Sequence, residues 1–168
     1  MHKEEIAVCF IALGSNMGDR FKNIQTALDM IKSDPKCQVI CKSPVYRSMP
    51  MYNSELDYFF NCVSCLETSY SPLDLLSALK EIEVKLGRNV SEKRYSARPI
   101  DLDILTYGKH VMESEELTIP HPHIKERKFV LKPWSDIASD YVLPNTDMDI
   151  NELLHNTPDT SELRLENK

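Results

Sequence analysis

Two aspartates, Asp101 and Asp103, form the sharpest chemical feature of the sequence. They lie in the apolar segment 100–107, which predicts a β-strand. Side chains two positions apart on a strand share one face, about 6.6 Å apart at Cα, so both carboxylates can reach one site while Leu102 and Ile104 face the core. Hard oxygen ligands of this kind suit Mg²⁺, which takes one or two carboxylates together with substrate phosphates. A solvent-facing acidic strand edge is the alternative interpretation.

A group of basic residues stands directly before this pair. Between Arg88 and Arg98 the chain carries four positive charges, those two arginines with Lys93 and Arg94, against Glu92 alone, although the formal net charge is −6. The acidic total makes general affinity for nucleic acid unexpected. The local excess indicates a localised anionic ligand, and a solvated basic loop is the alternative. Metal-binding carboxylates next to arginines suit a polyphosphate, because cations then neutralise both ends of the transferred group.

Other motifs narrow the choice of chemistry. His121 and His123 form a His-x-His pair in a segment fixed by prolines, but no further ligands stand at a spacing usual for zinc. The absence of a GxxxxGK[ST] sequence excludes a Walker-type kinase. The lone Gly14 is interpreted as a turn rather than a phosphate cradle.

Hydrophobic periodicity predicts the elements that position these residues. Strands are expected over residues 6–13, 39–46, 59–66 and 100–107, and helices over 19–32 and 72–86. Ser71 is the expected N-cap of the second helix and Gly87 its end. After Gly108 we expect irregular chain, because several prolines interrupt it, and one short helix at 149–154. The β-α-β-β-α-β order predicts an α+β fold, a ferredoxin-like sandwich with helices packed on an antiparallel sheet.

The length of 168 residues fits one domain. We expect this domain to span residues 1–158, followed by a mobile polar tail over 159–168. No apolar run is long enough for a membrane helix, and the charged N-terminus does not resemble a signal peptide. A cytoplasmic protein without membrane association is therefore expected.

The five cysteines agree with that compartment, because their odd number argues against a closed disulfide framework. Cys62 and Cys65 form a CxxC pattern within a predicted strand. Residues three apart on a strand point to opposite faces, so we interpret them as buried thiols rather than as a shared metal site.

Taken together, these motifs resemble the 6-hydroxymethyl-7,8-dihydropterin pyrophosphokinase family of folate synthesis. The resemblance extends from about Ile11 to Pro144 and is specific in the joint order and spacing of its segments. These segments are ALGSN at 12–16, VYRS at 45–48, FFN at 59–61, LET at 66–68, EIEVKLGR at 81–88, RPIDLDI at 98–104, PHP at 120–122 and ERKFVLKP at 126–133.

The resemblance implies a ferredoxin-like α+β fold and a reaction in which ATP and 6-hydroxymethyl-7,8-dihydropterin give AMP and the pterin diphosphate. Asp101 and Asp103 would hold two Mg²⁺ ions between the substrates, with Arg88 and Arg98 as further catalytic residues. The implied ATP contacts are Glu83, Arg94, Arg98, Ile104, Thr118, His121 and Arg127. The implied pterin contacts are Ser48, Pro50, Phe59, Asn61, Tyr95 and Phe129, although Phe59 alone would be interpreted as a core strand residue.

The family pattern also implies that the loops 49–57 and 88–97 close over the pterin and exclude water. This chain departs from bacterial members at four positions. Tyr95 and Ser96 replace a Trp-Gly pair, Lys80 stands where glutamine is common, and Glu116 stands where some members carry arginine. Family members also occur fused to neighbouring folate enzymes, so fusion or association with such enzymes is an expectation here.

Two functions from other classes stay open at this point. A non-catalytic ferredoxin-like module could sense a nucleotide, and a metal-dependent phosphohydrolase could release phosphate without any pterin. Formation of AMP only in the presence of the acceptor separates the transferase from both alternatives.

Overall fold

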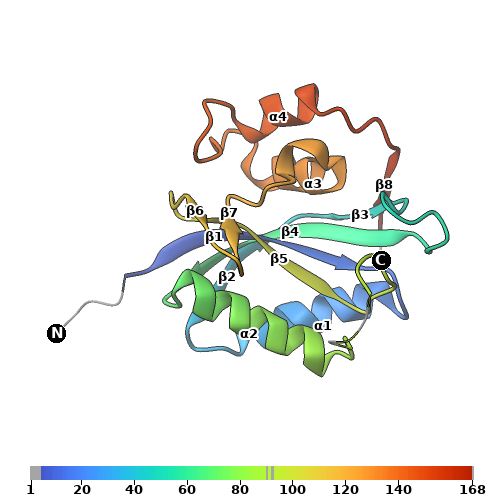
Figure 1. Cartoon of the computed structure of the whole chain (residues 1–168), viewed down its shortest axis with the longest axis horizontal. Helices are drawn as coiled ribbons and strands as arrows, with labels where there is room; N and C mark the ends of the chain where they lie inside the picture. The colour runs from blue at the N-terminus through green and yellow to red at the C-terminus, as the bar shows by residue number, and fades with distance from the viewer. Residues whose placement is uncertain (1–4, 90, 92, 168) are drawn as a thin grey trace.

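An antiparallel sheet lies between two pairs of helices in the computed structural model, which describes residues 5–89, 91 and 93–167 (Figure 1). Helices α1 (Arg20–Lys32) and α2 (Pro72–Lys85) cover one face of the sheet. On the opposite face α3 (Lys128–Ala138) packs against β4, with α4 (Ile150–Asn156) beside α3.

The strand order is that of a ferredoxin-like fold. The sheet contains β1 (Ala7–Ser15), β2 (Cys37–Lys42), β3 (Val45–Ser48), β4 (Phe59–Thr68), β5 (Asp101–Tyr107) and β8 (Leu163–Glu166). Its strands follow the order β5-β1-β4-β3-β8, with β2 also on β4, and every pair is antiparallel. The helices α1 and α2 connect strands that are not neighbours in the sheet, as in a split βαβ arrangement. The predicted α+β sandwich is confirmed.

The second helix begins and ends as its sequence predicts. Ser71 is the N-cap, and its hydroxyl accepts a hydrogen bond of 3.2 Å from the backbone N–H of Asp74. Pro72 occupies the first turn, where a missing N–H costs nothing. At the other end Gly87 has φ 102°, a left-handed conformation that glycine adopts without strain. The end of α2 at Gly87 therefore fixes where the basic loop begins.

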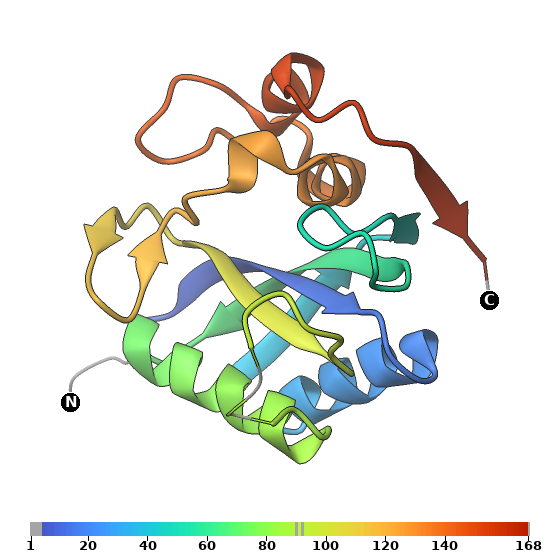
Figure 2. The ribbon, with the colours of Figure 1, turned by 45° about the vertical axis from the view of Figure 1, so that its right-hand side comes forward.

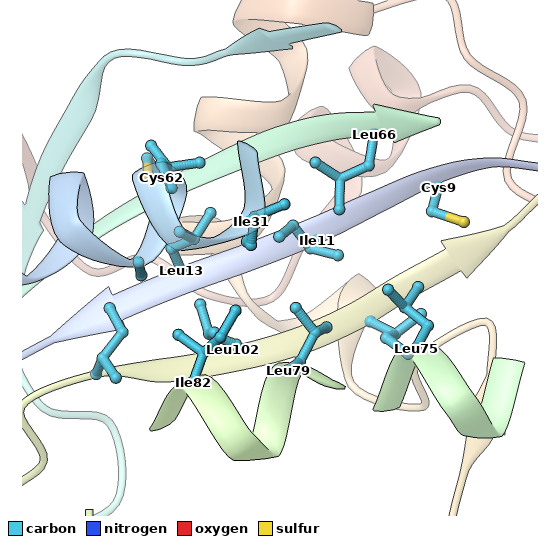
Figure 3. Close-up of a cluster of buried hydrophobic side chains, with 14 of the residues drawn as sticks. Cys9, Ile11, Leu13, Ile31, Cys62, Leu66, Leu75, Leu79, Ile82 and Leu102 are labelled. Atoms are coloured by element: carbon cyan, nitrogen blue, oxygen red, sulfur yellow. The ribbon is translucent and has the colours of Figure 1, made fainter. Parts of the chain in front are cut away.

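Alternation along β1 divides the core between the two faces of the sheet. Cys9, Ile11 and Leu13 pack toward α1 and α2, and Phe10 belongs to the cluster around α3. Figure 3 shows the first cluster, in which β1, β4 and β5 meet both helices. Burying a side chain of this size contributes about 1.5–3 kcal/mol, so apolar packing on both faces fixes the sheet.

The CxxC cysteines lie on opposite faces of β4, as predicted. Cys62 packs in the cluster under α1 and α2, whereas Cys65 packs in the cluster around α3. Burial raises the pKa of the Cys62 thiol to about 12, which leaves it protonated and unreactive at neutral pH. All five cysteines are free thiols.

Two predictions of secondary structure were wrong. The strand expected over 39–46 is divided into β2 and β3 at Ser43 and Pro44, because the Ser43 hydroxyl accepts a hydrogen bond from the Val63 N–H and proline cannot donate one. The chain after Gly108 is not irregular: it forms a small sheet of β6 (Met112–Glu113) and β7 (Thr118–Ile119), the 3-10 helix η1 (Ile124–Glu126), α3 and β8.

Helix α3 tolerates Pro133 in its interior because burial outweighs the lost hydrogen bond. Val130, Leu131 and Trp134 are all buried at helical spacing against the sheet. The short helix expected at 149–154 is present as α4, with Asp149 as its N-cap.

Within the described part of the chain, no helix is both long and apolar enough to cross a membrane.

Near its C-terminus the chain returns to the sheet as β8, which pairs with β3 (Figure 2). The Asp159 carboxylate accepts a hydrogen bond of 2.9 Å from the Lys128 N–H at the start of α3. Glu166 forms an ion pair of 3.1 Å with Arg47 of β3. Residues 163–166 are thus part of the sheet in the structure, while the division into a domain over 1–158 and a mobile tail over 159–168 stays a prediction.

Deleting residues 159–168 measures how firmly this segment is bound. If β8 persists in solution, the deletion should lower the free energy of unfolding by about 1 to 2 kcal/mol, because it removes strand pairing and the Asp159 contact. Urea unfolding followed by circular dichroism gives the value, with deletion of residues 167–168 alone as the control. An unchanged transition would mean that the tail is mobile, as its composition predicts.

Candidate active site

Asp101 and Asp103 lie on the same face of β5 and line a cavity of about 640 Å³. Strand pairing sets their position, since Asp101 pairs with Gly14 and Asp103 with Ala12 of β1. Leu102 between them is buried in the core under α1 and α2, as alternation predicts. Each of the two aspartates therefore lies beside a small residue of β1.

Two arginines converge on the first of these carboxylates. The Nη1 atoms of Arg88 and Arg98 each donate to Asp101 Oδ1 at 3.3 Å. The backbone of Arg98 is fixed independently, because its N–H donates to the Asn16 side-chain oxygen at 2.7 Å and its carbonyl accepts from the Asn16 N–H at 3.2 Å. Asn16, directly after β1, thus fixes the backbone of the basic loop at Arg98.

Glu83 joins α2 to the acidic strand. Its buried carboxylate accepts a hydrogen bond of 2.8 Å from the Leu102 N–H and forms an ion pair with Arg88. Burial raises the pKa of Glu83 above its ordinary value, and the charge of Asp101 acts in the same direction, while the Leu102 N–H and Arg88 oppose the rise. In this structure the Glu83 carboxylate therefore binds the backbone of β5 and holds the Arg88 side chain.

The electrostatics of the carboxylate pair fit a divalent cation. Burial raises the pKa of Asp103 from 3.8 to about 7, and the neighbouring charges of Asp101 and Glu83 add to the effect, against the opposing charges of Arg127 and Arg88. Asp103 thus lines the cavity with too little positive charge nearby to offset its burial. Two carboxylates on one rigid face, next to room for phosphates, are the donor set that Mg²⁺ prefers, and a bound cation would reverse the shift in pKa.

The raised pKa of Asp103 predicts a dependence of stability on pH. Between about pH 4 and pH 7 the unfolded chain has lost this proton while the folded chain keeps it, so stability falls as the pH rises through this range. Above pH 7 the full penalty applies. Asp103→Asn should therefore raise the melting temperature of the metal-free protein at pH 8 by several degrees and change it little at pH 4.

Thermal unfolding at the two pH values checks this result, with the exposed Asp140→Asn as the matched control. Magnesium should then stabilise the parent protein more than the Asp103→Asn variant. A variant less stable than the parent at pH 8 would show that Asp103 is not a destabilising charge.

His121 is held as a neutral imidazole. Burial lowers its pKa to about 4, and the positive charges of Arg127 and His123 add to the effect. The His123 backbone N–H donates to His121 Nδ1 at 3.1 Å, which assigns the ring proton to Nε2 and leaves that atom free to donate to a phosphate oxygen. Because Nδ1 accepts this hydrogen bond, it is not available as a metal ligand in this structure.

A second part of the cavity crosses the sheet from β5 toward β3. Asn61 of β4 is buried, pairs with Gly14 of β1, and donates to the Ser48 hydroxyl of β3 at 2.7 Å. A Cβ on Gly14 would lie 3.1 Å from Asn61 Oδ1, so glycine keeps the space beside this amide open. Gly14 lies inside β1, and its interpretation as a turn was wrong because the strand continues to Ser15.

The structure brings nearly all of the predicted site residues together. Those that line the cavity are Ser48, Phe59, Asn61, Glu83, Arg88, Arg94, Tyr95, Arg98, Asp101, Asp103, Ile104, Thr118, His121, Arg127 and Phe129. Pro50 does not line it, although its neighbours Met49 and Met51 do. The side chain of Ile104 is buried in the core, so a nucleotide contact there would involve its main chain.

The departures from the family pattern also lie at this cavity. Lys80, Ser96 and Glu116 line it together with Tyr95. Within the described residues the buried Ser96 hydroxyl and Arg98 Nε have no hydrogen-bond partner. Val90 and Glu92 of the expected closing loop 88–97 lie outside the described residues.

Comparisons with known proteins agree with this geometry. The model of the family described as 7,8-dihydro-6-hydroxymethylpterin-pyrophosphokinase matches residues 10–139. A 2-amino-4-hydroxy-6-hydroxymethyldihydropteridine pyrophosphokinase of Pseudomonas aeruginosa is 40% identical over 136 residues, covering 81% of this chain and 83% of that protein. The protein of the same name from Haemophilus influenzae is 38% identical over 156 residues, covering 93% and 96%.

The same sequence also matches part of longer proteins. The folic acid synthesis protein fol1 of Schizosaccharomyces pombe is 40% identical over 161 residues, which are 94% of this chain but 22% of that protein. Among solved structures, a Plasmodium falciparum HPPK-DHPS is similar with a TM-score of 0.73 at 14% identity, covering 92% of this chain and 44% of the other. At this identity the structural match supports the fold alone.

A pyrophosphokinase family uses ATP and generally needs a metal ion. Pterin pyrophosphokinase activity in folate synthesis follows for this chain from its near full-length match to two proteins of that name. The family model covers most of the sequence and the relatives exceed a third in identity. The chain therefore belongs to the 7,8-dihydro-6-hydroxymethylpterin-pyrophosphokinase family.

Proposed function

We propose that the pyrophosphokinase activity of this chain is centred on Asp101 and Asp103, which hold two Mg²⁺ ions. In this reaction the diphosphate of ATP passes as one unit to the hydroxymethyl oxygen of 6-hydroxymethyl-7,8-dihydropterin, and AMP leaves. The observation that carries the proposal is the position of the two carboxylates on one face of β5, between the arginines and the Asn61 part of the cavity. When bound, the magnesium ions neutralise phosphate charge and lower the pKa of the acceptor hydroxyl.

The triphosphate lies on the side of the site that carries positive charge and N–H donors. Arg98 Nε is buried with no partner among the described residues, and His121 offers its Nε2 proton. Arg127 lies close enough to affect the pKa values of both Asp103 and His121. These groups bind and orient the phosphates and need no covalent intermediate, because phosphoryl transfer depends mainly on positioning and charge neutralisation.

The pterin lies across the small residues of β1, beside Asn61. The Asn61 amide donates to Ser48 and can present its oxygen to N–H groups at the edge of a ring. Phe59 and Phe129 are half-buried in the cavity wall, where aromatic faces can stack on a flat heterocycle. This placement directs the hydroxymethyl group of the pterin toward Asp101 and Asp103.

A double label tests the transfer of an intact diphosphate. With ATP labelled separately at the β and the γ phosphorus, both labels should appear in the pterin product and neither in AMP. A simple kinase would transfer the γ label alone, and a phosphohydrolase would transfer neither label to the pterin. Either result would overturn the proposed reaction.

We further propose a cytoplasmic location for the enzyme, supported by its five free cysteines. The matches within longer folate synthesis proteins support association with, or fusion to, other enzymes of the same pathway. Gel filtration of a lysate, with activity measured in each fraction, would show whether the activity runs at 19.4 kDa or in a larger assembly.

A further inference from the structure

Tyr52, in the loop between β3 and β4, makes contacts that its sequence neighbourhood does not predict. Its side chain is 46% exposed, so burial in a core does not account for its position. Its hydroxyl accepts hydrogen bonds from Arg127 Nε and Nη2, each at 3.4 Å. The guanidinium of Arg127 also lies 5.6 Å from the centre of the Tyr52 ring, within the range of a cation–π contact.

The ring of Tyr52 reaches the loop between α2 and β5 as well. Its centroid lies 4.7 Å from that of Tyr95, at an interplanar angle of 31°. Next to it, the Asn53 side-chain amide donates to the Tyr95 carbonyl at 3.4 Å. Tyr95 has φ 61°, a left-handed conformation that tyrosine rarely adopts and that surrounding contacts must maintain. The Tyr52–Tyr95 ring contact and the Asn53–Tyr95 hydrogen bond thus connect the two loops.

Arg127 connects Tyr52 with the cavity that contains the two carboxylates. It lines this cavity together with Asp103 and His121. It also lies 5.8 Å from the centre of the Phe129 ring. Arg127 therefore contacts both Tyr52 and Phe129 and shares one cavity with Asp101 and Asp103.

We propose that Tyr52 is a positioning residue of the pyrophosphokinase reaction. Its hydroxyl fixes the guanidinium of Arg127 toward the triphosphate, and its ring supports Tyr95 over the acceptor part of the cavity. The inference rests on the proposed function, which assigns Arg127 to phosphate. Without a partner, the Arg127 side chain would occupy several rotamers of similar energy. The contact with Tyr52 restricts these rotamers before a nucleotide binds, so less side-chain conformational entropy is lost on binding.

Binding of α,β-methylene-ATP in the presence of Mg²⁺ tests this role without turnover. Titration calorimetry compares the parent with Tyr52→Phe, Arg127→Ala and the double variant. Tyr52→Phe removes only the hydroxyl and should raise the Kd about three- to tenfold. On the Arg127→Ala background the same change should have no effect, because the group it positions is absent.

A second comparison separates the hydroxyl from the ring. Tyr52→Phe should leave the KM for the pterin unchanged, whereas Tyr52→Ala should raise it, since Tyr95 then loses its stacking partner. Tyr70→Phe removes a different tyrosine hydroxyl, which donates to Asp34 away from the cavity, and should match the parent in nucleotide affinity. The melting temperature of Tyr52→Phe should equal that of the parent because the side chain is half exposed.

Parent affinity in Tyr52→Phe, or an undiminished effect on the Arg127→Ala background, would overturn the inference. A parent protein that binds the nucleotide with the expected coupling but transfers nothing would overturn the proposed function and leave only the part of Tyr52 in nucleotide binding intact. A parent protein that does not bind the nucleotide would overturn both.

Discussion

Replacing Asp101 or Asp103 by alanine should lower kcat by about a thousandfold or more, because each change removes half of the proposed metal-binding pair from the reacting phosphates. The two carboxylates lie on one face of β5, held by the pairing of this strand with β1. Neither side chain is needed for that pairing, which uses the backbone. Single-turnover measurements with saturating ATP and magnesium would therefore report the loss of chemistry rather than the loss of the fold.

The variants need a control for general damage. Asp140→Ala changes an exposed aspartate near the end of α3 and should retain the parent kcat. Circular dichroism should show the parent fold in all three proteins. Activity within tenfold of the parent in either Asp101→Ala or Asp103→Ala would rule out the two-carboxylate centre.

Arg98→Ala should lower kcat by about a hundredfold and weaken ATP binding much less. The guanidinium lies against Asp101, where charge builds up during transfer, and its Nε has no partner among the described residues. The substitution keeps the entry of the loop in place, because Asn16 binds the backbone of Arg98 and not its side chain. We therefore expect the Arg98 guanidinium to stabilise the transition state more than it stabilises bound ATP.

Rapid-quench kinetics give the rate of transfer, and nucleotide titration gives the affinity for ATP. Arg98→Lys should recover only part of kcat, because an ammonium cannot reproduce the planar fork of guanidinium donors. Equal losses in kcat and in ATP affinity would mean that Arg98 binds both states uniformly, which would contradict its assignment to transfer.

The part of the fold that the sequence predicts well is the part with simple periodicity. The apolar run of β1, the alternation in β5 and the three- and four-residue spacing in α1 and α2 each indicate buried side chains, and Ser71 and Gly87 mark the ends of α2. Helix α3 was missed because Pro133 suggests a break, although Val130, Leu131 and Trp134 follow a helical spacing that could have revealed it. Strand β8 was missed although Leu163 and Leu165 alternate with charged residues, because a segment of four residues is too short to predict a strand and its pairing with β3 is a long-range contact.

The candidate site shows the same division. Asp101 and Asp103 could be found from their spacing on a strand, and the other cavity residues from the joint family motifs. Asn16, which fixes Arg98, stands within such a motif, but its contact joins residues 82 positions apart. Tyr52 lies in an irregular loop, where neither periodicity nor charge indicates that its ring reaches Tyr95 and its hydroxyl Arg127. Contacts of this kind depend on tertiary structure and leave no local pattern.

The central claim is that this chain joins ATP to a pterin at its carboxylate centre. Its most direct test is the release of AMP from ATP and Mg²⁺, measured with and without 6-hydroxymethyl-7,8-dihydropterin. The account predicts AMP and pterin diphosphate in equal amounts, formed only when the pterin is present. AMP or phosphate released equally without the pterin would indicate a hydrolase, and nucleotide binding without any product in either case would indicate a binding module; both results would contradict the account.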